Sequence, residues 1–191
     1  MITTRNFRSI SSCPSSSVLA LLAVLAFCRP AAADDQTDCI NSENPDRAIP
    51  ACTRLLRTKP DFLSATYAYR GSAYVTKQDY DHALADLNEA IRLGRREFFV
   101  YGLRGMVHLQ KNEYDQAIAD FTELIRLNPP RERRALSHSL RGEAYEKLGR
   151  KEEAIADFRA ALTLDPSLTQ SKEGLNGRQR AAVDEYQARL G

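Results

Sequence analysis

The chain has 191 residues, of which 43% are apolar and 27% are charged. These proportions are ordinary for one soluble globular domain or slightly more. The formal net charge is +2, but residues 1–33 hold three of the 27 basic residues and none of the 25 acidic ones. The remaining chain therefore has 24 basic residues against 25 acidic ones, a balance that gives no support to nucleic-acid binding.

The N-terminal segment has the pattern of a secretory signal peptide. Arg5 and Arg8 precede an apolar run over residues 18–27, and Ala31–Ala33 then supplies small residues. The run is too short for a transmembrane helix, which needs about 20 residues. We therefore expect residues 1–33 to be a signal peptide and the mature protein to be secreted, into the periplasm of a bacterial cell.

Two alternatives to cleavage after Ala33 stay open. The leader could be retained as an N-terminal membrane anchor. A lipid anchor at Cys28 fits less well, because the bulky Phe27 stands where such sites have a small residue.

One sequence pattern occurs three times downstream of the leader. It reads (Tyr/His)-x-x-Arg-Gly-x-x-(Tyr/His), followed by Ala-(Ile/Leu)-Ala-Asp-(Phe/Leu). The glycines are Gly71, Gly105 and Gly142, so the copies are spaced by 34 and then 37 residues. A period in this range indicates a repeat protein, in which each unit buries its apolar face by stacking on its neighbours.

Each copy predicts two amphipathic helices. Apolar and small residues recur at helical spacing in both halves of the pattern. Short polar turns at 77–79, 111–113 and 148–150 separate the halves. The second helix of a copy ends at Gly94 or before a proline such as Pro129, which disfavours helix at the preceding residue.

This pattern closely resembles the tetratricopeptide repeat family over residues 64–166. The resemblance implies an all-α fold, an α-solenoid of antiparallel helix hairpins with three full units within 63–166. We place these units at 64–97, 98–131 and 135–168. The departures from the family pattern are mild. Arg95 stands where a terminal proline is expected, Lys151 replaces a tyrosine, and three residues are inserted around 131–134.

Partial elements flank the three units. Residues 46–60 align with the second helix of a repeat, and a short first helix is expected near 36–42, so 34–62 reads as a half unit. Residues 167–191 have helical periodicity and are expected to form a C-terminal capping helix, which such arrays need to close their core.

Cys39 and Cys52 are predicted to form a disulfide within the half unit. Cys13 and Cys28 lie in the leader, so these two remain as a pair in an oxidising compartment. They are 13 residues apart, the same separation as Tyr74 and Leu87. The disulfide would thus replace the contact between first and second helix. A metal site is not expected, because the three histidines are scattered over the repeats.

An arginine precedes each repeat glycine, and an aspartate follows that arginine by 16 residues. The three pairs are Arg70 with Asp86, Arg104 with Asp120, and Arg141 with Asp157. One hypothesis is a row of cations that binds an acidic ligand. The favoured interpretation is a structural ion pair inside each hairpin, because the half unit lacks both members, with Ala51 at the aspartate position.

The first helices are expected to line a concave groove that binds a protein or peptide partner. The repeat register places nine residues there: Ala68, Ser72, Val75, Phe99, Met106, Leu109, Leu136, Ser139 and Glu143. An apolar patch with an adaptable methionine would lie in the middle repeat. The alternative is that Phe99 and Met106 only pack against neighbouring repeats.

The function expected from this pattern is a non-catalytic adaptor of the bacterial envelope. No nucleophile–base set, metal motif or phosphate-binding loop is recognisable, so no cofactor is expected. The Lys/Asn arrangement that clamps a C-terminal carboxylate in some family members has no counterpart. The alternative function is binding of an anionic lipid head group or wall polymer by arginines near the inter-repeat turns. These are Arg92, Arg95, Arg96, Arg126, Arg131, Arg133 and Arg134. Membrane contact is expected only through an uncleaved leader or these turns.

Overall fold

The computed structural model describes residues 31–168 with the exception of residue 59. Most of the expected signal peptide and nearly all of the expected capping helix therefore lie outside the described residues. The described elements are α2 (Ala31–Ile40), α3 (Pro45–Thr58), a 3-10 turn η1 (Pro60–Phe62), α4 (Leu63–Thr76), α5 (Tyr80–Arg92), α6 (Phe98–Gln110), α7 (Tyr114–Arg126), α8 (Arg131–Lys147) and α9 (Lys151–Leu164).

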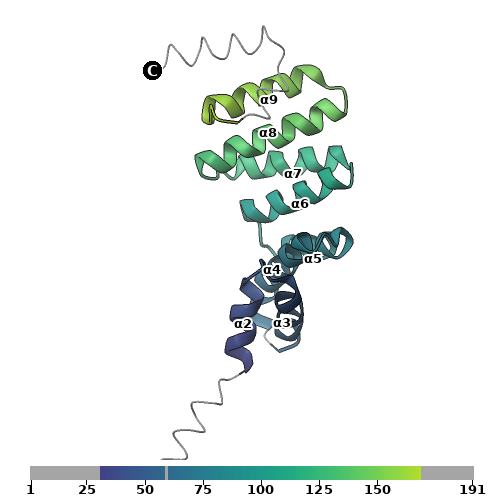
Figure 1. Cartoon of the computed structure of the whole chain (residues 1–191), viewed down its shortest axis with the longest axis vertical. Helices are drawn as coiled ribbons and strands as arrows, with labels where there is room; N and C mark the ends of the chain where they lie inside the picture. The colour runs from purple at the N-terminus through teal and green to yellow at the C-terminus, as the bar shows by residue number, and fades with distance from the viewer. Residues whose placement is uncertain (1–30, 59, 169–191) are drawn as a thin grey trace, which may run out of the picture.

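The helices form four antiparallel hairpins: α2 with α3, α4 with α5, α6 with α7, and α8 with α9. Figure 1 shows the hairpins stacked in chain order along the long axis of the molecule. No strand is present among the described residues. The prediction of an all-α solenoid is confirmed.

The three repeat turns share one backbone geometry. Gln78, Asn112 and Gly149 each have a positive φ, of 62°, 60° and 74°. The amide of the residue after each one donates to a carbonyl five residues back, for example Asp79 N to Tyr74 O at 3.0 Å. This is the Schellman ending of a helix, which satisfies carbonyls that the helix leaves free. The same ending therefore reverses the chain direction in each of the three units.

The repeat glycines let the two helices of a hairpin approach closely. A Cβ built on Gly142 would lie only 2.7 Å from Phe158 Cε1, and one on Gly105 would lie 3.0 Å from Phe121 Cε1. Both phenylalanines are almost fully buried. The side chain missing from the first helix therefore leaves the space that the aromatic ring of the second helix fills.

Two helix boundaries differ from the sequence expectation. Helix α8 begins at Arg131, so the inserted residues 131–134 add a turn to the first helix of the third unit instead of forming a loop. Pro130 at its N-cap suits a helix start, because proline disfavours helix at the residue before it. Helix α2 begins at Ala31, earlier than the expected 36–42, and includes the last residues of the expected leader.

Candidate functional site: a groove along the first helices

The arginine that precedes each repeat glycine forms a bidentate ion pair with the aspartate of its own hairpin, through two parallel hydrogen bonds. Arg104 Nε and Nη2 donate to the two carboxylate oxygens of Asp120 at 2.9 and 2.5 Å. The pairs of Arg70 with Asp86 and of Arg141 with Asp157 have the same geometry, at 2.7 and 2.8 Å. The aspartates are buried and the arginines are largely covered. These side chains are thus engaged within the scaffold.

The same arginines also join neighbouring repeats. Arg70 Nη1 donates to Thr53 Oγ1 at 3.1 Å, and Arg104 Nη1 donates to Asn88 Oδ1 at 2.7 Å. Arg141 Nη1 donates to Thr122 Oγ1 at 2.8 Å. The three acceptors share one register, directly after the core residue of the preceding second helix. The sequence analysis did not predict this contact between repeats. The polar residue that recurs at the acceptor position could have indicated it.

The third repeat adds a histidine to its ion pair. His138 stands where the other repeats have tyrosine, and its Nδ1 lies 2.8 Å from Asp157 Oδ1. Burial acts to raise the pKa of Asp157, but hydrogen bonds from Arg141 and His138 together prevail, so this pKa lies below its ordinary value. The carboxylate is held ionised and saturated with donors. It is therefore unsuited to act as a proton acceptor for a substrate.

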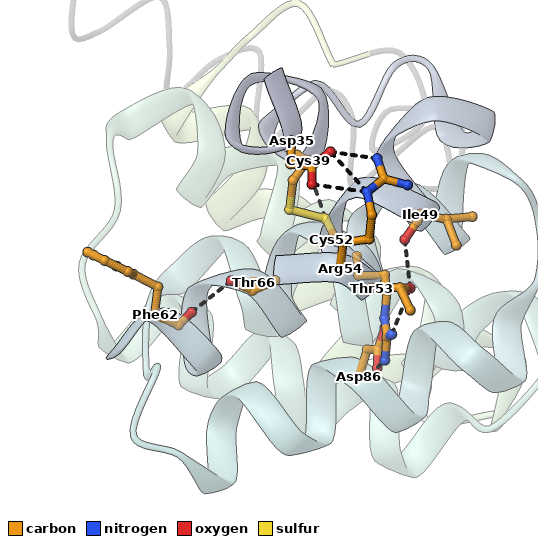
Figure 2. The surroundings of a disulfide bond; sticks show 10 residues. Asp35, Cys39, Ile49, Cys52, Thr53, Arg54, Phe62, Thr66 and Asp86 are labelled. Carbon is orange, nitrogen blue, oxygen red and sulfur yellow. Dashed lines mark hydrogen bonds and ion pairs between the residues drawn. A yellow bond between two sulfur atoms is a disulfide. The ribbon is translucent and has the colours of Figure 1, made fainter. Parts of the chain in front are cut away.

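The half unit is held together by its cysteines. Cys39 on α2 and Cys52 on α3 are joined by a disulfide with an S–S distance of 2.05 Å. Both residues are buried, and Figure 2 shows the bridge between the two helices. Arg54 Nε and Nη2 also donate to the carboxylate of Asp35 on α2, at 2.5 to 3.0 Å. The two helices of the half unit are short, with ten residues in α2 and 14 in α3, so the crosslink supplies a constraint that a small core cannot.

A cavity of about 360 Å³ lies along the first helices of the second and third repeats. Four of the residues predicted for the groove line it: Ser72, Phe99, Met106 and Leu136. Sequence reasoning missed others, among them Phe98, Leu103, Leu140 and Arg133. Met106 and Leu136 are 37% and 45% exposed. The cavity therefore offers apolar side chains to solvent, as a binding groove requires.

A second cavity, of about 340 Å³, continues this groove toward the repeat turns. It shares Met106 and Leu140 with the first and adds the predicted residues Leu109 and Glu143. Lys147 also lines it. We use "the α6–α8 groove" for the two cavities together. One arginine, Arg133, lies in the first cavity, and an acidic residue and a lysine lie in the second.

The groove prediction is wrong for the side chains of Ala68 and Ser139, which are buried. Ala68 packs with Leu87, Ala90 and Val100, where the α4–α5 hairpin meets α6. These positions lie three residues before the repeat glycine, and Gly102 has the same register. Small residues in all three copies were the signal of close packing here. Val75 is partly buried in the same cluster and lines neither cavity of the groove.

Several of the arginines near the inter-repeat turns have local partners. Arg92 and Arg126 bind Glu89 and Glu123 of their own helices. Arg131, in the first turn of α8, donates to the Thr163 carbonyl at 3.5 Å, near the end of α9. Arg133 and Arg134 also lie in this first turn, and Arg134 Nη1 donates to Asn128 Oδ1 at 2.6 Å, just beyond the end of α7.

Two further findings bear on the site. Within the described ranges, no helix is long and apolar enough to cross a membrane. The same residues contain no group of three or more histidine, cysteine or acidic side chains that could hold a metal ion.

The stacked hairpins and the α6–α8 groove define a helical-repeat protein with an apolar groove along its first helices. Models of the tetratricopeptide repeat match residues 65–94 and 103–168. Together with the stacked hairpins, these matches show that the chain belongs to the tetratricopeptide repeat family. No curated protein matches the chain.

Solved structures share the fold. A tetratricopeptide domain of Arabidopsis OM64 is 29% identical, with a TM-score of 0.54, over 62% of this chain and 94% of that one. MamA from Desulfovibrio magneticus is 19% identical with a TM-score of 0.68, over 84% and 91%. The second tetratricopeptide domain of human RPAP3, solved with an HSP70 peptide, is 22% identical with a TM-score of 0.53, over 65% and 98%.

Proposed function

We propose that this chain is a non-catalytic adaptor that binds a peptide segment or a partner protein in the α6–α8 groove. The observation that carries the proposal is the exposure of Met106 and Leu136 on facing first helices, beside a cavity of about 360 Å³. Single exposed apolar residues are common, but two beside one apolar cavity form a surface that a partner can cover.

The chemistry of the groove indicates what kind of segment fits. Phe98, Phe99 and Leu140 give an apolar floor, which suits one or two apolar anchor side chains. Arg133 lies over the ring of Phe98, with its guanidinium carbon 6.0 Å from the ring centroid. Its charge favours an acidic residue beside the anchors. Structures of other tetratricopeptide domains hold peptides, including HSP70 and HSP90 peptides, which supports peptide binding as the mode of action.

The site of action we propose is the bacterial envelope, after export and cleavage following Ala33. The leader pattern and the disulfide both support it, because structural disulfides persist in oxidising compartments. The measurement is the mass of the protein recovered from the envelope fraction. A mature chain that begins at Asp34 and carries one disulfide agrees with the proposal. An intact N-terminus or two free thiols would contradict it.

Site-specific photo-crosslinking tests the groove. A photo-reactive residue in place of Leu136 should capture a defined partner in the envelope, and the same residue in place of Glu152, an exposed position on α9, should not. Capture at position 136 should then be lost in the Met106→Asp variant, which places a charge at a partly exposed position in the groove.

The outcome that rejects groove binding is equally specific. Groove binding is rejected if positions 136 and 152 capture the partner equally. It is also rejected if capture at position 136 persists in the Met106→Asp variant while circular dichroism shows that this variant is folded. Capture that instead depends on Arg131 and Arg134, and that weakens steeply with salt, would favour the anionic envelope ligand.

A further inference from the structure

Arg95 departs from the repeat pattern and occupies an unusual environment. In the next unit the equivalent residue is Pro129, which is buried. Arg95 lies in the connection between α5 and α6, and its guanidinium carbon is 5.8 Å from the centroid of Tyr69 and 5.6 Å from that of Phe99. Two aromatic rings therefore hold a cation at the boundary between the first and second repeats.

The hydrogen-bonding edge of Arg95 is incompletely used. The three repeat arginines each place Nε and Nη2 on the two oxygens of a buried aspartate. Arg95 Nη2 has only long contacts, of 3.3 and 3.4 Å, with Glu97, whose side chain is half exposed. Arg95 Nε is buried and has no hydrogen-bond partner among the described residues. A buried donor without a partner destabilises the protein. The N–H groups on this edge are therefore suited to donate hydrogen bonds to a carboxylate.

A cavity of about 170 Å³ lies beside this edge. The residues that line it include Arg95, the aromatic side chains of Phe62 and Tyr69, and Gln36 and Ile40 of α2. Cys39 also lines it, so the disulfide holds the α2 wall in place. Ile40 and Phe62 are exposed at its rim. The cavity thus combines apolar walls with one cation.

We propose that this cavity binds a carboxylate carried on an apolar group about the size of a benzene ring. The apolar group would fill the space between Phe62, Tyr69 and Ile40. The carboxylate would take the place of Glu97 on Nη2 of Arg95 and, with a small rotation of the guanidinium, would also reach the buried Nε. The volume agrees, because a cavity of about 150 Å³ accommodates benzene. The source of the carboxylate is either a free organic acid or an apolar C-terminal residue of a peptide.

The acidic groups of the surrounding helices leave Arg95 available. Asp35 and Asp38 of α2 bind Arg54 and Arg47. Glu97 is the acid in contact with Arg95, and it competes with the ligand for Nη2. Asp61 of η1 is exposed. A ligand carboxylate would therefore displace a weak surface contact and pair a buried donor.

The probes are phenylacetate and its uncharged analogue phenylacetamide, titrated into the intact protein. The affinity is measured by isothermal titration calorimetry in every variant, and in proteins that keep Arg95 its Nε–H signal in the nitrogen–proton spectrum reports where the ligand binds. Phenylacetate should shift this signal, and Arg95→Gln should weaken binding by at least about tenfold, because charge-assisted bidentate contacts are the strong ones. N-acetylphenylalanine distinguishes the sources: tighter binding than phenylacetate indicates a peptide C-terminus, and weaker binding indicates a free acid.

Two matched variants keep the test decisive if Arg95→Gln is unstable. Glu97→Gln removes the competing carboxylate and should strengthen phenylacetate binding, by up to about fivefold. Arg96→Gln removes the same charge from the exposed neighbouring position and should leave the affinity unchanged. Equal binding of phenylacetamide, no binding of either acid, or no gain in Glu97→Gln would overturn the proposal.

The site is independent of the α6–α8 groove, since neither Met106 nor Leu136 lines it. Met106→Asp should therefore abolish partner capture in the groove and leave phenylacetate binding intact. Failure of one proposal leaves the other standing.

Discussion

Replacing Arg104 with methionine removes the guanidinium that holds Asp120 but keeps an apolar stem beside Tyr101. The Asp120 side chain is 3% exposed, and its remaining basic neighbour is His108 Nε2 at 3.8 Å. A buried charge that loses its partner destabilises a protein by about 3 to 5 kcal/mol. Arg104→Met should therefore lower the free energy of unfolding by this amount.

The opposite single variant should be milder. In Asp120→Ala the Arg104 side chain is 21% exposed and keeps its hydrogen bond to Asn88. Water can replace part of the lost contact, so we expect a loss of about 2 kcal/mol. The double variant leaves no unpaired charge. Its loss should fall short of the sum of the two single losses by at least about 2 kcal/mol.

Urea unfolding followed by circular dichroism at the helical band measures all four proteins of this cycle. The matched control is the exposed pair of Glu123 and Arg126 on α7, with side chains 40% and 64% exposed. Its coupling should stay below about 0.5 kcal/mol. Losses at Arg104 and Asp120 that add within about 0.5 kcal/mol would refute the idea that each depends on the other.

Three further predictions concern the scaffold. Replacing Cys39 and Cys52 together with serine should lower stability by roughly 3 kcal/mol in urea unfolding; an unchanged midpoint would argue against a structural disulfide. Gly142→Ala places a Cβ 2.7 Å from Phe158 Cε1 and should cost about 1 to 3 kcal/mol, partly restored by Phe158→Leu; full stability of the single variant would contradict the close approach. The lowered pKa of Asp157 means that its contribution is present above the unfolded-state pKa and lost as the pH falls through the folded-state pKa. Unfolding measured from about pH 7 to pH 3 should therefore show a smaller acid loss for Asp157→Asn than for the parent protein, and equal losses would count against this role.

The repeat architecture could be predicted from the sequence because each unit is a local structure. Gly71, Gly105 and Gly142 recur with their helix partners at constant separation, and a helix hairpin depends on contacts within about 34 residues of chain. The same register brought Cys39 near Cys52 and each arginine near its aspartate. A repeated local fold can be predicted from sequence, because the residues that form the same contacts recur in every copy at the same spacing.

The tertiary structure decided what lies between units, because contacts between hairpins depend on how each one rotates against the next. It buried Ala68 and Ser139, which the register had assigned to the groove, and it extended α8 back to Arg131, which brought Arg133 to the groove. It also placed Arg95, visible in the sequence only as a missing proline, between two rings and beside a cavity. The sequence alone thus established the repeating hairpin, and the packing of one hairpin on another established which surfaces are left to bind a partner.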